Sequence, residues 1–340
     1  MIKIDGSYLE GGGQIVRTAL ALSALTGKSF EVDNIRKGRC DSGLKSQHLH
    51  CIKALEELCN AKTNDIKIGS EYLRFIPGKI TAKNLNIDIG TAGSITLLLQ
   101  SLLLPCLFQK KKIKLSIIGG TDGKWQMPFD YFNEVFIPRI NEYADIDVKL
   151  FKRGYYPKGG GKIEININPK YKFDDLPNKP IMLLEQGELL QIKGTSHASK
   201  DLEKASVSER QAKIAESLLK GYNVPINIRT EYHDTLNPGS GIVLWAKFEN
   251  TILGSDGLGE IRKKAELVGE EAAKGLIKEI DSKASVDSHL EDNILPFMAL
   301  FGGKIRVPEL TNHTKTNIYV TENFLDVKFK VDEKEKIISV

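Results

Sequence analysis

The chain has 340 residues, of which 41% are hydrophobic, 27% are charged and 7% are aromatic. This length and composition exclude a disordered chain or a mini-protein, and they allow one large hydrophobic core or two ordinary ones. The formal net charge is only +4, so any binding to a polyanion must come from local clusters of charge.

Neither a membrane span nor a secretory signal is visible. The longest apolar run, residues 95–108, is shorter than the roughly 18 residues that span a bilayer, and it contains Gln100. The first residues are polar and rich in glycine, unlike a secretory signal. The four cysteines form neither a C-x-x-C motif nor a Cys/His grid. We therefore expect reduced thiols, no zinc site and a cytoplasmic protein.

The predicted elements repeat along the chain. The first unit has strands at residues 2–4 and 29–35, helices at 14–25 and 45–59, and a strand pair that ends near residue 80. The second unit has strands at 85–89 and 113–118, helices at 95–108 and 128–143, and strands at 147–150 and 161–167. A weaker third unit has helices at 287–301 and 312–324, and strands at 304–308, 325–331 and 336–340.

The wide spacing between the second and third units indicates an insertion. It supplies strands at 189–194, 227–232 and 241–248 and helices at 206–221 and 261–280. The sequence therefore predicts an α/β (α+β) fold, in which three βαβαββ-type units form a large domain from residues 1–184 and 280–340. Residues 185–279 are predicted to form a smaller inserted βαββα domain.

A glycine-rich turn connects the first strand to the first helix. Its three glycines, residues 11–13 between Glu10 and Gln14, let the backbone approach a bulky group closely. The free N–H groups of the helix start, with Arg17 one turn later, would favour an anion. A turn with nothing bound is the more common interpretation of such a signal alone, and this run is neither a Walker nor a Rossmann motif.

A basic cluster follows. Residues 36–53 contain five Lys or Arg residues, including Arg36 and Arg39, against one Asp. Guanidinium groups beside glycine suit phosphate recognition, and Gln47 and His48 add polar groups at the same place. This pattern favours contact with phosphate or nucleic acid; the alternative is a solvated basic loop.

His313 stands at the start of a predicted helix, after a strand. A helix N-terminus disfavours the charged imidazolium, so the ring tends to stay neutral and nucleophilic. Histidine is a known covalent nucleophile towards phosphorus. A lone histidine is, however, more often a capping residue or a hydrogen-bonded core residue.

Several blocks, in the same order, resemble the RNA 3′-terminal phosphate cyclases over essentially the whole chain. They are residues 5–17 (Asp-Gly … Glu-Gly-Gly-Gly-Gln-Ile-Val-Arg), 35–48, 119–122 (Gly-Gly-Thr-Asp), 153–161 (Arg-Gly-Tyr-Tyr-Pro … Gly-Gly-Gly), 290–300 and the block around His313. The resemblance implies a fold of three βαβαββ-type units with an insertion. It also implies the ATP-dependent conversion of an RNA 3′-phosphate into a 2′,3′-cyclic phosphate, with release of AMP and pyrophosphate.

By this resemblance, His313 is the nucleophile that becomes adenylylated, and Glu10 holds a divalent cation, Mg²⁺ or Mn²⁺. Arg17, Arg36 and Arg39 correspond to arginines around the triphosphate and the RNA terminus, and Gln47 and His48 to polar residues nearby. The implied ATP-binding positions are Gln100, His289, Leu290, Glu291, Asp292 and Asn293. Two positions depart from the family pattern: Asn293 stands where glutamine is common, and His289 where an aromatic residue can occur.

Two other functions share this type of fold. Relatives that assist ribosome assembly bind RNA without catalysis and lack the nucleophilic histidine, which this chain has. Enolpyruvyl-type transferases are built from similar repeats, but that comparison is by fold analogy alone. We therefore expect an enzyme that acts on RNA 3′-phosphate ends and needs no membrane. The sequence leaves the oligomeric state open, with a homodimer as one possibility.

Overall fold

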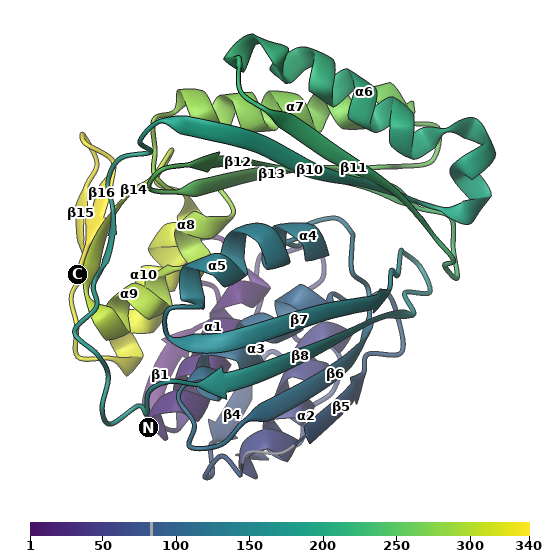
Figure 1. The fold of residues 1–340 in the computed structure, drawn as a ribbon. Helices are drawn as coiled ribbons and strands as arrows, with labels where there is room; N and C mark the ends of the chain where they lie inside the picture. Colours follow the sequence, from purple (N-terminus) through teal and green to yellow (C-terminus); the bar gives the residue numbers. More distant parts are fainter. Residues whose placement is uncertain (82–83) are drawn as a thin grey trace.

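The computed structural model describes residues 1–81 and 84–340. Three four-stranded mixed sheets surround a bundle of helices, and a fourth four-stranded sheet with two long helices lies at one end of the molecule (Figure 1). No helix in these described ranges is long and apolar enough to cross a membrane.

The three sheets of the body share one topology. The first contains β1 (Ile2–Asp5), β2 (Phe30–Asp33), β4 (Leu73–Ile76) and β3 (Lys62–Thr63), in that spatial order. The second contains β5 (Asn84–Asp88), β6 (Ile113–Gly119), β8 (Gly161–Pro169) and β7 (Ala144–Lys152). The third contains β9 (Ile181–Leu183), β14 (Gly303–Arg306), β16 (Ile337–Ser339) and β15 (Lys330–Asp332). In each sheet the first pair is parallel and the other two pairs are antiparallel.

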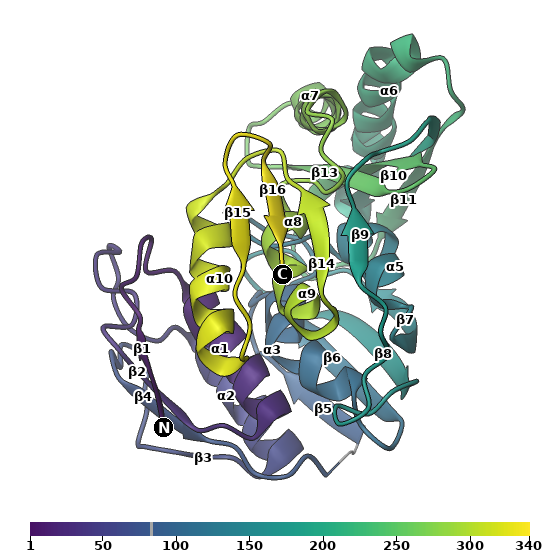
Figure 2. The same cartoon turned by 90° about the vertical axis from the view of Figure 1, so that its left-hand side faces the viewer.

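The helices of the body lie between these sheets (Figure 2). They are α1 (Gly13–Thr26), α2 (Ser46–Cys59), α3 (Ile95–Leu107), α4 (Phe129–Tyr131), α5 (Ile137–Ile140), α8 (Leu290–Asn293), α9 (Leu295–Phe301) and α10 (Asn312–Phe324). Helix α1 packs against both α3 and α10. Because α3 is apolar on nearly every side and α1 is buried along most of its length, both form the centre of the large core.

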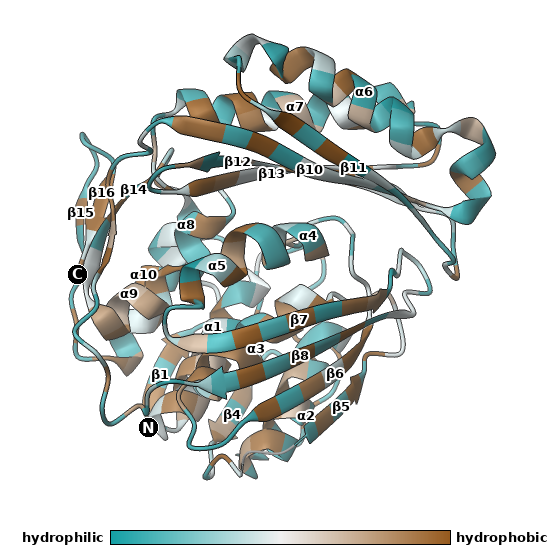
Figure 3. Ribbon diagram, viewed as in Figure 1, coloured by the Kyte–Doolittle hydropathy of each residue, from teal (hydrophilic) through white to brown (hydrophobic). Residues whose placement is uncertain are grey.

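The fourth sheet has the order β11-β10-β12-β13. Its strands are β10 (Leu189–Ser199), β11 (Ile226–His233), β12 (Ser240–Phe248) and β13 (Ile252–Leu258). Helices α6 (Val207–Leu219) and α7 (Ala265–Asp281) cover its outer face and enclose a second hydrophobic core. The exposed sides of both helices carry hydrophilic residues, as the amphipathic pattern requires (Figure 3).

The mixed α/β class is confirmed, and several details differ from the prediction. The predicted helix 128–143 is α4 and α5 with a π-helical segment, Phe132–Phe136, between them, and the predicted strand 325–331 is only β15. Strand β13 was not predicted, because Gly254 and Gly257 dilute its apolar pattern. The predicted helix 287–301 is two short helices, α8 and α9, that meet at Ile294. The third sheet begins with β9, a three-residue strand that precedes the insertion and is too short to show a period-2 pattern.

Candidate active site

His313 is the second residue of α10, and its ring contacts two other parts of the chain. The hydroxyl of Thr311 caps the helix by accepting a hydrogen bond from the Thr314 N–H at 3.1 Å. The Nδ1 atom of His313 lies 2.5 Å from Oε1 of Gln14. Its Nε2 atom lies 3.1 Å from Oε2 of Glu10, in a half-exposed position open to a ligand.

A continuous chain of hydrogen bonds extends from Gln14 across the body. The Gln14 amide donates to Asp292 Oδ2 at 2.6 Å, and the Asn293 amide donates to Asp292 Oδ1 at 2.7 Å. Gln100 donates to Asn293 Oδ1 at 2.7 Å, and Arg17 Nε donates to Gln100 Oε1 at the same distance. Residues from α1, α3 and α8 that are up to 278 positions apart therefore form one polar surface beside His313.

Glu10 lies at the other side of the imidazole. Its carboxylate accepts from Arg39 Nη2 at 3.1 Å, and its carbonyl oxygen accepts from Arg39 Nε at 3.0 Å. Magnesium and manganese sites in nucleotide-binding proteins often use one or two carboxylates together with phosphate oxygens. A single half-exposed carboxylate between a guanidinium and a histidine fits that donor set.

Positive charge surrounds His48 at the start of α2. Its Nδ1 accepts the Lys45 backbone N–H at 2.9 Å. Burial, reinforced by the charges of Arg17, Arg36 and Lys45, lowers the pKa of His48 to about 3, so its ring is neutral. A Cβ on Gly13 would lie 2.2 Å from His48 Nε2, which explains why glycine starts α1 at this point.

Arg36 has the clearest unmet hydrogen-bonding capacity in this basic region. It adopts a left-handed conformation with φ of 58°, and its Nη2 atom reaches Asp41 O only at 3.4 Å. Its Nε atom is buried and has no hydrogen-bond partner within the described residues. A buried guanidinium N–H without an acceptor is suited to an anionic ligand.

Like His48 and Arg36, three further predicted residues lie outside the hydrogen-bonded chain. Gln47 contacts the carbonyl oxygen of Ser94 at 3.4 Å. The Leu290 side chain is fully buried in the hydrophobic core. Glu291 accepts from the hydroxyls of Thr311 and Thr314 at 2.6 and 2.7 Å, and it thereby holds the start of α10. Burial raises the pKa of Glu291 to about 7.

His289 connects this site to the fourth sheet. Its Nε2 atom lies 2.9 Å from Asp256 of β13, and its ring meets Tyr131 edge-on with a centroid distance of 5.1 Å. Burial opposes a charge on this ring, but Asp256, Asp287 and Glu279 outweigh it and raise the pKa of His289 to about 9.

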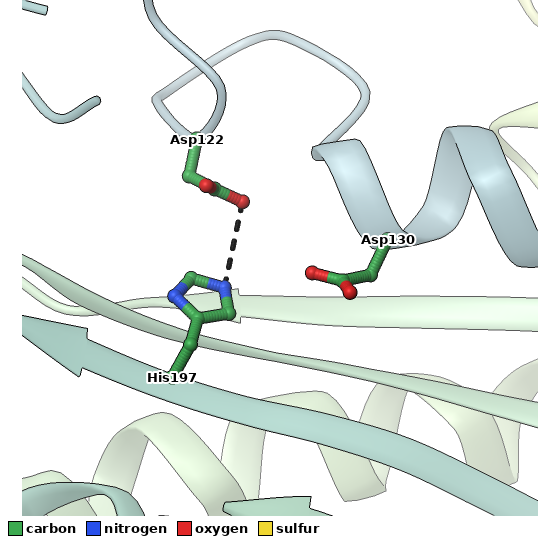
Figure 4. A group of neighbouring side chains, drawn as sticks. All are labelled: Asp122, Asp130 and His197. Carbon is green, nitrogen blue, oxygen red and sulfur yellow. Dashed lines mark ion pairs between the residues drawn. The ribbon is translucent and has the colours of Figure 1, made fainter. Parts of the chain in front are cut away.

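A second polar cluster joins the fourth sheet to the body. Asp122, Asp130 and His197 converge in a buried space, with the Asp122–His197 contact at 3.4 Å (Figure 4). Arg153 is fully buried there, at 3.2 Å from Asp122 and 2.7 Å from Asp130. Because its guanidinium already forms an ion pair with each carboxylate, we interpret this cluster as an ionic connection and not as a metal site.

Sequence reasoning overlooked two residues of this arrangement. Gln14 belongs to the glycine-rich run but received no role of its own, although it is the residue that contacts His313 through Nδ1. Asp256 lies on the strand that was not predicted. For Gln14, its place directly after the three glycines and at the helix start was the available signal.

Comparison with known proteins shows which family the chain belongs to. Residues 8–331 match the family model described as RNA 3′-terminal phosphate cyclase. Proteins named RNA 3′-terminal phosphate cyclase from Pyrococcus furiosus and Pyrococcus abyssi are each 45% identical to this chain; the alignments cover 97% and 98% of this chain and 95% of each relative. The protein of that name from Methanosarcina acetivorans is 44% identical, over 100% of this chain and 99% of its own. The chain therefore belongs to the RNA 3′-terminal phosphate cyclase family of enzymes.

Proposed function

We propose that this protein converts an RNA 3′-terminal phosphate into a 2′,3′-cyclic phosphodiester at the expense of ATP. The reaction would pass through a covalent His313–AMP intermediate and an RNA-(3′)pp(5′)A intermediate, and release AMP and pyrophosphate. The observation that carries this proposal is the half-exposed imidazole of His313 between Gln14 and Glu10, next to Arg17 and Arg39.

In the first step, Nε2 of His313 attacks the α-phosphorus of ATP while the bond to pyrophosphate breaks. The guanidinium groups of Arg17 and Arg39 are available to neutralise the phosphate oxygens. The polar groups of Gln100 and Asn293 and the charged ring of His289 are available to the nucleotide. A divalent cation, Mg²⁺ or Mn²⁺, held by Glu10 would add charge neutralisation at the phosphates.

In the second step, an oxygen of the RNA 3′-phosphate displaces His313 from AMP, which returns the electron pair to Nε2. The neighbouring 2′-hydroxyl then attacks the activated 3′-phosphorus, loses its proton and releases AMP. The unpartnered Nε of Arg36 supports a role for this residue in holding the RNA phosphate.

The first step is tested by incubating the protein with α-labelled ATP and a divalent cation, followed by denaturing electrophoresis. The expected result is covalent label that survives alkali, is lost in acid and is absent from the His313→Ala variant. His50→Ala is the matched control, because His50 bonds within its own helix, at Ser46 O, and to no other side chain in residues 1–81 and 84–340. A folded wild-type protein that takes up no label would contradict the proposal and favour an RNA-binding scaffold.

A further inference from the structure

The side-chain amide of Gln14 has only one chemically sensible orientation. Its Nε2 atom lies 2.6 Å from the Asp292 carboxylate and 3.4 Å from the backbone oxygen of His313, and the latter can only accept. Gln14 is only 5% exposed to solvent, so water does not compete freely for these contacts. Its Oε1 atom must therefore face Nδ1 of His313, where it is an acceptor.

The rest of the hydrogen-bonded chain fixes the same direction independently. Arg17 can only donate, so Gln100 accepts with its oxygen and donates with its nitrogen to Asn293. The Asn293 nitrogen donates to the backbone oxygen of His289 at 2.6 Å, as well as to Asp292. Asp292 thus accepts an amide N–H at each of its two oxygens. Its contact with the Gln14 nitrogen holds the Gln14 oxygen on the side of His313.

These contacts determine which nitrogen of His313 carries the proton. An amide oxygen 2.5 Å from Nδ1 requires a proton on that nitrogen, so the neutral ring has its lone pair on Nε2, the atom that faces Glu10 and the open site. We propose that Gln14 is a positioning residue that holds the neutral ring of His313 in this Nδ1–H tautomer, with the Nε2 lone pair directed towards the open site. This inference rests on the proposed role of His313 as the adenylylated residue.

The proposed step needs no proton transfer at Nδ1. The Nε2 lone pair forms the N–P bond, and the electrons of the P–O bond leave with pyrophosphate. The phosphoramidate ring keeps its Nδ1–H, which remains bonded to Gln14. When RNA takes the AMP, the N–P electrons return to Nε2 and the starting tautomer is restored.

The test uses two variants of the full chain: Gln14→Met and the control Gln109→Met. Gln109 is a half-buried glutamine that bonds to Pro105 O, away from the site. The ¹⁵N resonances of His313, assigned by comparison with His313→Ala, report the tautomer of the neutral ring without nucleotide. The rate of labelling by α-labelled ATP at saturating concentration reports the nucleophile.

We expect an Nδ1–H ring in the wild type and in Gln109→Met, and a mixed or Nε2–H ring in Gln14→Met. Labelling by Gln14→Met should be slower by roughly 10–100-fold, the usual cost of losing a group that orients a functional histidine, with little change in the ATP concentration for half-maximal rate.

Two results would overturn the inference. One is an Nε2–H ring in the wild type; the other is a folded Gln14→Met variant with the wild-type tautomer and the wild-type labelling rate. Failure of the proposed function would look different from either result. In that case neither the wild type nor any variant would be labelled, while the ¹⁵N resonances would still report the tautomer of His313.

Discussion

The imidazole of His313 lies between an amide and a carboxylate, and these neighbours face different nitrogens of the ring. Gln14 orients the ring through Nδ1 without adding charge. Glu10 faces Nε2 with a carboxylate oxygen that it also shares with Arg39. A cation or phosphate group that engages Glu10 and Arg39 would free Nε2 for attack.

Replacing Glu10 by Gln should reduce labelling by α-labelled ATP roughly tenfold or more, because the carboxylate proposed to hold the cation is lost. The Mg²⁺ or Mn²⁺ concentration required for half-maximal labelling should rise. Glu164→Gln, which removes an exposed partner of Lys114, is the control. An unchanged metal requirement in Glu10→Gln would show that the cation is held elsewhere.

Replacing Arg36 by Gln should weaken binding of an RNA 3′-phosphate oligonucleotide and reduce its dependence on salt. One lost phosphate contact on a single strand corresponds to a change of about 0.7 in the slope of log K against log salt. Arg210→Gln, far from the site in an ion pair with Glu266, should leave the slope unchanged. If Arg36→Gln and Arg210→Gln had the same slope of log K against log salt, a phosphate contact at Arg36 would be contradicted.

Glu291 should make the stability of the protein depend on pH. Its folded-state pKa of about 7 is above the ordinary 4.5, so the folded state binds the proton more tightly and the contribution to stability falls as pH rises between these values. Glu291→Gln keeps the acceptor oxygen for Thr311 and Thr314 but carries no charge. We compare the free energy of unfolding of Glu291→Gln with that of the wild type. The variant's value minus the wild-type value should increase by on the order of 1–3 kcal/mol from pH 4.5 to pH 8. A difference that does not vary with pH in urea unfolding would contradict this.

At the scale of elements, strong periodicity made most of the fold predictable. Helix α10 has the predicted bounds, and β6 extends one residue beyond them, because buried and exposed residues alternate along its whole length. Strand β13 and the break between α8 and α9 were missed because glycines and a proline weaken the local pattern. The partners of Gln14 were not predictable in the same way, since they lie 278 and 299 positions away and come together only in the packed helices.

The loop of Arg153 and strand β10 are joined by buried charges, and this predicts a large effect of Arg153→Ala. Burial opposes ionisation of Asp122, but His197 and Arg153 hold its pKa well below the usual range. Removing Arg153 would leave Asp122 and Asp130 buried without their counter-ion, at a cost of about 3–5 kcal/mol in the free energy of unfolding. Lys149→Ala, which breaks an exposed pair with Asp147, should cost less than about 1 kcal/mol. Equal costs in thermal or urea unfolding would contradict this account.

At the scale of the whole molecule, the fourth sheet is attached to the body by buried hydrogen bonds close to the site. Asp287 accepts from the Tyr131 hydroxyl at 2.5 Å and from the Gly254 N–H at 2.7 Å. Thr251 donates to the Ser285 carbonyl oxygen at 2.6 Å. Because α8 follows directly after these residues, the position of the fourth sheet and that of His289, Asp292 and Asn293 are mechanically linked (Figure 1).

The central claim is that His313 carries AMP from ATP to an RNA 3′-phosphate, and a single-turnover chase tests it most directly. Protein labelled with α-labelled ATP is freed of nucleotide and mixed with an RNA that ends in a 3′-phosphate. The account predicts that the label leaves the protein as AMP while the RNA end becomes resistant to phosphatase. Label that stays on the protein, or an RNA end that remains sensitive to phosphatase, would contradict it.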